Sequence, residues 1–227
     1  MQDRPVAAEM GIKMEIKSLL LGAARTNCYI VYLPETKKAV IIDPADDAER
    51  IQRVIQDLEV TPEAILLTHG HFDHMLAAAD LRKKYQIPVG CLLAEKEVLG
   101  DSWKNASSSF MFPYGMEANE FYEDGQVLPY LDELFHVIAT PGHTVGSCCY
   151  YAERVRKLFS GDTLFYETIG RTDLPTGKAE AIQSSIREKL FVLPDRVMVY
   201  PGHGEETTIR HEKQFNMQLL RENDDLY

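Results

Sequence analysis

The sequence predicts a sheet-rich α/β layered fold in one domain. Short aliphatic runs bounded by Gly, Pro, Asn or Asp recur along the chain and predict strands. Stretches with apolar residues at helical spacing lie among them and predict helices. Some strands follow one another as hairpin-like pairs, which a simple parallel sheet would not contain. No linker rich in Pro, Gly or Ser divides the chain, so we expect a single domain over residues 13–227 after a weakly ordered or disordered segment, residues 1–12.

The first half of the chain opens with strands and then alternates helix and strand. The strand-like runs span residues 13–20, 28–32 and 39–43. Apolar residues then recur at helical spacing from Ile51 to Leu58, with Asp46 and Asp47 at the amino end, where negative charge is favourable. A strand at 65–67, a helix from Met75 that ends before Pro88 and a strand at 88–93 follow.

Residues 101–126 interrupt this alternation. The three serines at 107–109 are typical of a loop, yet the segment is rich in aromatic residues. These are Trp103, Phe110, Phe112, Tyr114, Phe121 and Tyr122. Long internal loops are often functional, so the segment either caps a pocket with apolar surface or covers the core, and both interpretations stay open.

The second half repeats the pattern of the first. Strands are expected at 135–139, 147–151, 155–159 and 197–200. Ile182, Ile186 and Leu190 mark a helix between the last two strands, and a short helix is expected over 212–220.

Composition narrows the classes of partner. The chain has 227 residues and a formal net charge of -11, which disfavours binding to nucleic acid phosphates. No apolar run is long enough to span a membrane, and the N-terminus lacks the apolar centre of a signal peptide, although Met14 is an alternative start to Met1. The four cysteines, Cys28, Cys91, Cys148 and Cys149, show no CxxC spacing and are interpreted as reduced thiols. We therefore expect a cytoplasmic protein that binds neither nucleic acid nor membrane.

Four metal-competent side chains follow the strand at 65–67 within six residues. His69 and His71 point the same way in an extended turn and can chelate one ion, while Asp73 and His74 can turn towards a second. Imidazole and carboxylate are the usual ligands of zinc and its neighbours, and a site with few thiolates favours catalysis over structure. The alternative, a solvated polar loop, explains this density of histidine poorly.

Three later strands also end in a Gly-containing turn that presents one metal-competent residue. These residues are His143, Asp162 and His203. The resulting seven groups exceed the four ligands of a tetrahedral site, so they suit two ions that share one carboxylate. His136 and His211 are left over and are interpreted as structural.

The HxHxDH motif with the later His, Asp and His resembles the metallo-β-lactamase superfamily, and the chain is similar to short glyoxalase II-type (hydroxyacylglutathione hydrolase-like) proteins within it. The likeness extends from about residue 13 to the end and includes IIDP at 41–44 and GRTDLP at 170–175. It implies a four-layer αβ/βα sandwich with the site at one edge of two facing sheets.

The resemblance also implies how the ligands divide between two divalent ions, most simply Zn²⁺, with Fe or Mn as alternatives. The division is His69, His71 and His143 on one ion, Asp73, His74 and His203 on the other, and Asp162 between them. Asp43 would steady the site from behind, unless it is only a turn residue at a strand end.

Such a site predicts hydrolysis of a small-molecule acyl thioester. Metal ions lower the pKa of bound water towards about 7, and a bridging hydroxide would attack the polarised carbonyl and release a thiolate. Asp73 and Asp162 are the expected catalytic carboxylates, with Asp73 also orienting the hydroxide.

Substrate contacts are less well defined by the sequence. Arg171 is the candidate for an anionic part of the substrate, unless it forms a surface salt bridge with Asp173, and Tyr166 is a second candidate. Full-length glyoxalase II carries a helical C-terminal extension that supplies much of its glutathione binding. Here 24 residues (227 minus 203) follow His203, so glutathione specificity is not expected to follow from the resemblance.

Two other functions remain open. A persulfide dioxygenase of the same superfamily would hold one iron through residues matching His69, His143 and Asp162. A non-catalytic metal-binding module would keep the fold and lose a ligand, and no ligand is lost. A secreted β-lactamase, a flavodiiron-type domain with HxExD and a nuclease all fit less well.

Overall fold

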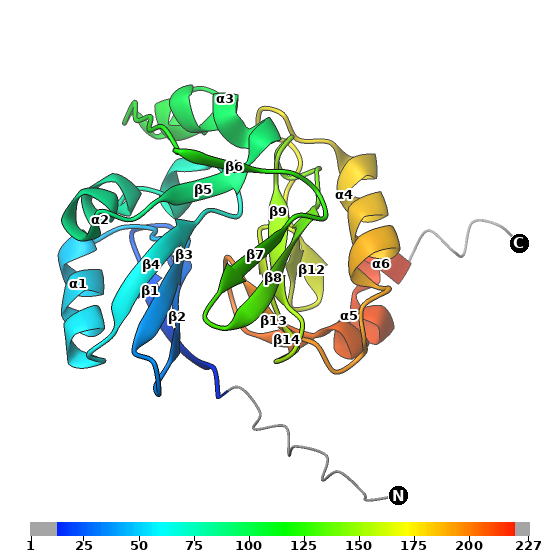
Figure 1. Cartoon of the computed structure of the whole chain (residues 1–227). Helices are drawn as coiled ribbons and strands as arrows, with labels where there is room; N and C mark the ends of the chain where they lie inside the picture. Colours follow the sequence, from blue (N-terminus) through cyan, green and yellow to red (C-terminus); the bar gives the residue numbers. More distant parts are fainter. Residues whose placement is uncertain (1–12, 221–227) are drawn as a thin grey trace, which may run out of the picture.

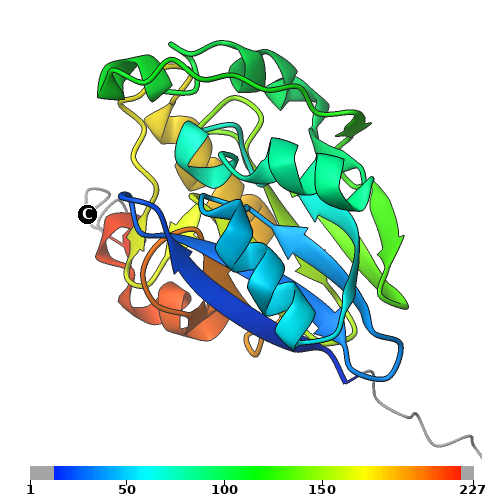
Figure 2. The ribbon, with the colours of Figure 1, turned by 90° about the vertical axis from the view of Figure 1, so that its left-hand side faces the viewer.

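The computed structural model describes residues 13–220, which form four layers: helices, sheet, sheet, helices (Figure 1). Helices α1 (Ala48–Asp57) and α2 (Ala78–Tyr85) cover the outer face of the first sheet (Figure 2). On the far side, α4 (Ala179–Ser185), α5 (Ile209–Phe215) and α6 (Met217–Leu220) lie outside the second sheet (Figure 1). The predicted α/β sandwich is confirmed, whereas residues 1–12 and 221–227 lie outside the described part of the chain.

The first sheet has six strands in the order β1 to β6. They are β1 (Glu15–Leu21), β2 (Thr26–Leu33), β3 (Lys38–Ile42), β4 (Thr61–Leu66), β5 (Val89–Leu92) and β6 (Glu120–Tyr122). The pairs β1–β2 and β2–β3 are antiparallel, and the pairs from β3 to β6 are parallel. The carboxyl ends of β3, β4 and β5 therefore meet at one edge.

The second sheet also has six strands, in the order β14-β13-β10-β9-β8-β7. They are β7 (Val127–Tyr130), β8 (Glu133–Ala139), β9 (Cys148–Ala152), β10 (Lys157–Gly161), β13 (Met198–Pro201) and β14 (Thr207–Thr208). Its one parallel pair is β10–β13. A separate hairpin of β11 (Leu164–Phe165) and β12 (Thr168–Ile169) leaves this sheet at the edge that carries the site.

Three apolar layers hold these elements together. One lies between the first sheet and its helices and includes Ile51 and Leu81, and a second fills the space between the sheets around Ile42 and Tyr150. The third lies between the second sheet and α4 and includes Ile186. Cys148 faces the central layer and Cys149 the outer one, which confirms that these adjacent cysteines point to opposite faces.

The structure differs from the sequence prediction at several element boundaries. β4 begins earlier than predicted, at Thr61. Pro62 does not prevent this, because it lies beside a shift in the register of the β3–β4 pairing, where its missing amide hydrogen is tolerated. The helix expected from Met75 begins only at Ala78, after a 3-10 turn. The helix expected over 212–220 breaks at Asn216, whose extended backbone ends α5 and whose side-chain amide donates to the carbonyl of Thr168.

Two short strands of the central region were not predicted. β6 lies within the aromatic segment and β7 follows it, and both are too short for a clear alternating pattern. Pro129 in β7 is compatible with this strand because β7 is at the edge of its sheet. Across residues 13–220, no helix is long and apolar enough to cross a membrane.

Candidate metal centre

The loop after β4 carries four of the predicted ligands in one tight turn. His69 and His71 precede the 3-10 turn η1 (Phe72–His74), and Asp73 and His74 lie within it. The side chains of His69, His71 and His74 are buried. Buried imidazoles need partners for their ring nitrogens, since an unpaired buried polar atom costs free energy.

The second half of the chain presents one further candidate after each of three strands. His143 follows β8, Asp162 follows β10 and His203 follows β13. Only glycine fits at Gly202, because an added Cβ would lie 2.2 Å from Oδ1 of Asp162. The structure thus brings all the predicted ligand residues, which come from both halves of the chain, to one place.

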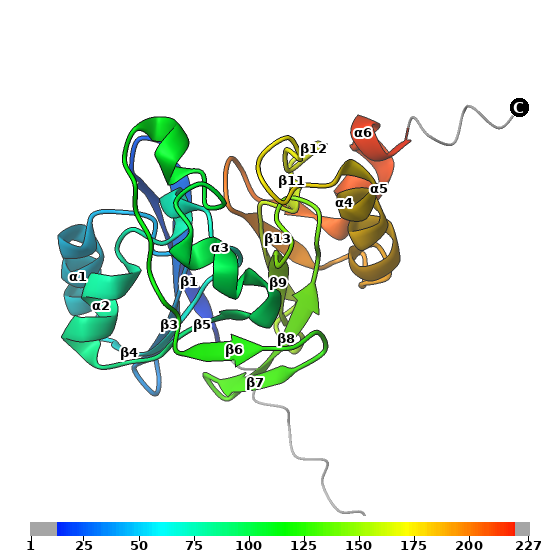
Figure 3. The same cartoon turned by 90° about the horizontal axis from the view of Figure 1, so that it is seen from above.

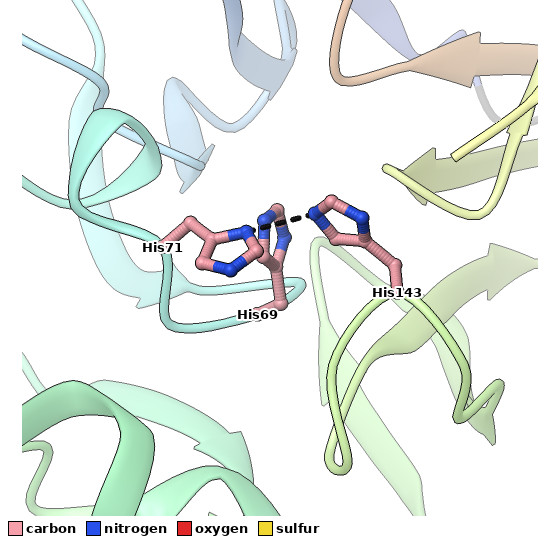
Figure 4. A group of neighbouring side chains, drawn as sticks. All are labelled: His69, His71 and His143. Carbon is pink, nitrogen blue, oxygen red and sulfur yellow. Dashed lines mark hydrogen bonds between the residues drawn. The ribbon is translucent and has the colours of Figure 1, made fainter. Parts of the chain in front are cut away.

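His69, His71 and His143 form the first group of candidate ligands. Nδ1 of His71 lies 2.8 Å from Nε2 of His143, and both rings contact His69 (Figure 4). Nδ1 of His143 donates to the carbonyl oxygen of Arg171 (2.8 Å), which leaves Nε2 of His143 available to an ion. Nε2 of His69 and Nε2 of His71 are buried and have no hydrogen-bond partner within residues 13–220.

Asp73, His74 and His203 form the second group, and Asp162 lies between the two groups. Nε2 of His203 is 3.4 Å from Oδ2 of Asp73 and 3.5 Å from Oδ2 of Asp162. Nε2 of His74 is 3.4 Å from Oδ1 of Asp162. The Asp162 carboxylate is also 3.4 Å from Nε2 of His143, so one carboxylate faces both groups.

This donor set fits divalent metal ions. Ligand atoms about 2.0–2.1 Å from a tetrahedral ion lie about 3.3 Å from one another. The separations of 3.4 and 3.5 Å around Asp162 are close to that spacing and long for hydrogen bonds. Nε2 of His74 and Oδ1 of Asp162 are also buried without hydrogen bonds, and a bound ion would satisfy both atoms.

Asp43 supports the site from behind. Its carboxylate accepts hydrogen bonds from the Thr68 amide (2.8 Å), the Thr68 hydroxyl (2.7 Å) and Nδ1 of His74 (3.0 Å). The bond to Nδ1 fixes the His74 ring and directs its Nε2 towards the second group. Asp43 is buried, and its φ of 48° is uncommon for a non-glycine residue, so these hydrogen bonds hold a strained position.

Glu95 connects the two loops that carry candidate ligands, and no motif or spacing in the sequence pointed to this residue. It ends the 3-10 turn η2 (Leu93–Glu95) and is fully buried. Oε1 accepts from the amide of Gly70, between His69 and His71, and Oε2 accepts from the amide of Gly146, in the loop that carries His143. Burial raises the pKa of Glu95 to about 7, although the two amides oppose that shift.

The start of β2 makes further contacts to the site that the sequence did not indicate. The Thr26 hydroxyl donates to Oδ2 of Asp73 (2.8 Å). The Asn27 side chain donates to the carbonyls of Pro201 (3.0 Å) and Gly204 (3.0 Å), on either side of His203. Strand β2 of the first sheet therefore helps to position one candidate ligand from the first half of the chain, Asp73, and one from the second half, His203.

The first group is held in its neutral form. Burial, and then the neighbouring His143, lowers the pKa of His71 to about 3. Burial also lowers the pKa values of His69 and His143, with the facing Asp162 carboxylate opposing the shift at His143. Neutral imidazole is the form that binds a metal ion, so this group is ready to do so.

In the second group and at Asp162, carboxylates and imidazoles shift one another's pKa values. Burial opposes ionisation of Asp162, but the nearby His74 and His143 lower its pKa to about 2. Asp73 follows the same pattern, because His74, His203 and the Thr26 hydroxyl outweigh its burial and lower its pKa. In return, the carboxylates raise the pKa values of His74 and His203 against the effect of burial.

The two predicted substrate residues lie in different surroundings. Arg171 lines the cavity in front of the cluster, and its guanidinium makes two hydrogen bonds of 2.7 Å to Asp173. Tyr166 is not among the lining residues, because its ring stacks on His211 with 4.9 Å between centroids. His211 also pairs with Glu167, and His136 pairs with Glu153, which agrees with structural roles for these two histidines.

Comparison with known proteins defines the class. The profile described as "Metallo-beta-lactamase superfamily" matches residues 21–203. The chain therefore belongs to the metallo-β-lactamase superfamily, as its sequence motifs indicated.

Individual relatives are similar over nearly the whole chain. "Hydroxyacylglutathione hydrolase GloC" of Haemophilus influenzae is 35% identical over 207 residues, which are 89% of this chain and 97% of that protein. "Probable metallo-hydrolase YqgX" of Bacillus subtilis is 38% identical over 212 residues, 89% of this chain and 96% of that protein.

Solved structures give the same result. BLEG-1, described as a B3 metallo-beta-lactamase, has a TM-score of 0.87 at 38% identity and covers 91% of this chain and 100% of its own. TTHA1623 in a di-iron-bound form has a TM-score of 0.79 at 32% identity, and the match covers 88% of this chain and 98% of TTHA1623. ETHE1 from Myxococcus xanthus has a TM-score of 0.76 at 29% identity, and the match covers 94% of this chain and 92% of ETHE1.

Proposed function

We propose that this protein is a metal-dependent hydrolase that cleaves a small-molecule acyl thioester. The observation that carries the proposal is the Asp162 carboxylate, which lies 3.4–3.5 Å from imidazole nitrogens of both ligand groups. A carboxylate in that position suits two ions that act on one substrate atom. Similarity to GloC and to the di-iron form of TTHA1623 supports both the hydrolase activity and the pair of ions.

The protein's residues would hold, orient and shield the reacting groups. Divalent ions bound here, with Zn²⁺, Fe or Mn as the candidates, would polarise the thioester carbonyl and lower the pKa of a bound water. The Thr26 hydroxyl donates a hydrogen bond to Asp73, and this carboxylate would accept a proton beside the cluster. A thiolate leaves readily as an anion, which removes the need for a dedicated general acid.

The test uses metal removal and one substitution. Chelation should abolish hydrolysis of a panel of acyl thioesters that includes a hydroxyacyl-glutathione, and added Zn²⁺, Fe²⁺ or Mn²⁺ should restore it. Asp162→Asn should lower metal occupancy and reduce the rate about 100-fold or more. Asp195→Asn, a surface residue paired with Lys213, is the control and should leave both unchanged. Full activity in metal-free protein, or in Asp162→Asn, would overturn the proposal.

A second candidate function is a mononuclear iron persulfide dioxygenase, for which the cluster offers imidazoles beside one carboxylate. His69, His143 and Asp162 would supply its facial triad of ligands. The hydrolase is preferred because His71, Asp73, His74 and His203 also belong to the cluster, so it offers more ligand candidates than one iron needs. One tightly bound iron per chain, with oxygen consumption on a persulfide and no thioester hydrolysis, would establish the dioxygenase instead. A non-catalytic metal-binding module would bind metal and show neither activity.

We also propose a cellular compartment and a class of partner for this activity. We place the enzyme in the cytoplasm, acting on a small molecule and binding neither nucleic acid nor membrane, on the strength of its net charge of -11 and its four unpaired cysteines.

A further inference from the structure

A cavity of about 650 Å³ opens directly onto the candidate metal cluster. One end is lined by His71, Asp73, His143, Asp162 and His203. A volume of this size takes a substrate of drug-like dimensions, so the cavity has room for more than the reacting carbonyl.

The remaining walls are mostly apolar and come from separate parts of the fold. The apolar lining residues are Leu21, Phe72, Leu76, Phe110, Phe112 and Leu174, with small alanines between them. Phe110 and Phe112 belong to the aromatic segment left open by the sequence, and Leu174 follows the β11–β12 hairpin. In Figure 3 the green part of the aromatic segment that precedes β6 rises to the same edge as the β11–β12 hairpin, whereas β6 itself lies at the opposite edge.

The aromatic segment is anchored. The buried Asn105 accepts at its carbonyl from the Phe72 amide (3.1 Å), and its side-chain amide donates to the carbonyl of Tyr114 (2.8 Å). The Phe110 ring then packs against the Phe72 ring with 5.1 Å between centroids. The wall is therefore tied to the turn that carries Asp73 and His74.

Phe110 and Phe112 are nevertheless 66% and 54% exposed. A core-covering segment would bury such rings, whereas these face the cavity and water. Aromatic surface of this kind gains free energy when an apolar ligand covers it.

The charges around the cavity disfavour an anionic occupant. Outside the candidate metal cluster, Arg171 is the one cationic side chain among the described residues that line the cavity, and its guanidinium is already paired with Asp173. Asp46 also lines the cavity, on the side of Leu21. The thiol carriers of biological thioesters commonly bear carboxylates or phosphates, which would find no unpaired cation here.

We propose that this cavity is an acyl subsite that selects thioesters with a bulky uncharged apolar acyl group, with Phe110 and Phe112 as its specificity-determining residues. The inference rests on the proposed hydrolase function and adds the substrate class. The acyl group would lie along the aromatic wall with its carbonyl at the cluster, while the thiol carrier would extend into solvent.

The test is a series of thioesters of one uncharged thiol, N-acetylcysteamine, assayed with metal-loaded protein. The acyl group is varied from acetyl through butanoyl and hexanoyl to phenylacetyl. We expect kcat/KM to rise about tenfold or more from acetyl to phenylacetyl. Phe110→Ala and Phe112→Ala should flatten the series, because each lowers kcat/KM for the phenylacetyl ester more than for the acetyl ester, and Phe110→Leu should restore part of the slope. Trp103→Ala is the matched control, an exposed aromatic of the same segment outside the cavity lining.

A parallel measurement does not depend on turnover. Calorimetry should show that phenylacetate binds metal-loaded protein at least about tenfold more tightly than acetate, and that Phe110→Ala removes the difference. A flat acyl series with robust hydrolysis, or a preference set by the thiol when the acyl group is held constant, would overturn the subsite and leave the hydrolase intact. Selective phenylacetate binding without hydrolysis of any thioester would support the subsite and overturn the hydrolase.

Discussion

At the residue scale, Asp43 shows how a buried side chain outside the ligand set can control the site. Its two carboxylate oxygens accept from two donors on Thr68 and one on His74. Replacing one oxygen with an amide nitrogen would set a donor against these donors and free the His74 ring to rotate.

We therefore expect Asp43→Asn to weaken metal binding about 10–100-fold, chiefly at the group that contains His74. Competition titration against a chelating indicator dye measures this affinity. Asp57→Asn, an exposed carboxyl at the end of α1, is the control and should bind as the wild type does. Equal affinities for Asp43→Asn and wild type would show that Asp43 is only a strand-end residue.

Protonation gives a second prediction at this scale. The pKa values of His74 and His203 are raised by the nearby carboxylates, whereas burial lowers those of His69, His71 and His143, so a proton competes with an incoming ion more strongly at the second group than at the first. A proton competes with a metal ion for the same lone pair, so affinity at the second group falls as the pH falls.

Titration of metal-free protein should accordingly show that affinity for the second ion falls more steeply with falling pH than affinity for the first, with proton release accompanying the second ion. Calorimetry in buffers of different ionisation enthalpy measures the released protons. If both groups fill together at every pH and release no protons, then His74 and His203 are not more readily protonated than the histidines of the first group, and the prediction is wrong.

The candidate ligand residues could be picked out from the sequence because their signal is local, and the structure brings them together. Four lie within six residues, and His143, Asp162 and His203 each follow an apolar run and a glycine turn. Glu95 and Thr26 carried no such signal, because their roles come from contacts with loops far away in the chain.

At the scale of elements, the turn η2 acts as a connection between two loops. Glu95 uses one oxygen for the Gly70 amide and the other for the Gly146 amide, so a glutamine at this position can accept from only one of them. The other amide would be left buried and unpaired.

Glu95→Gln should lower the free energy of unfolding by about 1–3 kcal/mol and weaken metal binding at the first group, because His71 and His143 are no longer held in register. Urea denaturation and metal titration measure the two effects. Glu97→Gln is a matched control two residues away, since that exposed side chain pairs only with Lys104 among the described contacts. A loss of stability with unchanged metal affinity would mean that Glu95 supports the fold and leaves the site unaffected.

Elements with a strong period were predicted well and short ones were not. α1 follows its apolar stripe, and Asp47 caps it by accepting from the Arg50 amide. β6 and β7 were not predicted because pairing with the neighbouring strands β5 and β8 stabilises their extended conformation, and their own sequences show no clear strand pattern.

At the scale of the whole molecule, the site joins the two halves of the chain. Ligand candidates come from the first half at His69 and from the second half at His143 and His203. Backbone contacts also cross between the halves, such as the Cys148 amide to the Thr68 carbonyl (2.8 Å) and the Asn27 amide to the Gly202 carbonyl (2.7 Å). The order of strands in the two sheets depends on such long-range contacts, which is why periodicity predicted the elements and only the family resemblance predicted the four layers.

Metal binding should therefore stabilise the molecule as one cooperative unit. An ion that binds only the folded state contributes about 2.7 kcal/mol at 100 times its dissociation constant, equivalent to a rise of roughly 5–10 °C in Tm. Differential scanning calorimetry with Zn²⁺ should show a single transition that moves upward. Mg²⁺, which prefers oxygen ligands, is the control ion and should have little effect. Two transitions, of which only one responds to Zn²⁺, would indicate that the site belongs to one half alone.

The most direct test of the pair of ion sites is anomalous X-ray diffraction from crystals of metal-loaded protein, recorded at the absorption edges of zinc, iron and manganese. We predict two peaks about 3.5–4 Å apart, one bound by His69, His71 and His143 and the other by Asp73, His74 and His203, with Asp162 contacting both. A single peak at full metal loading, or peaks bound by other residues, would contradict it.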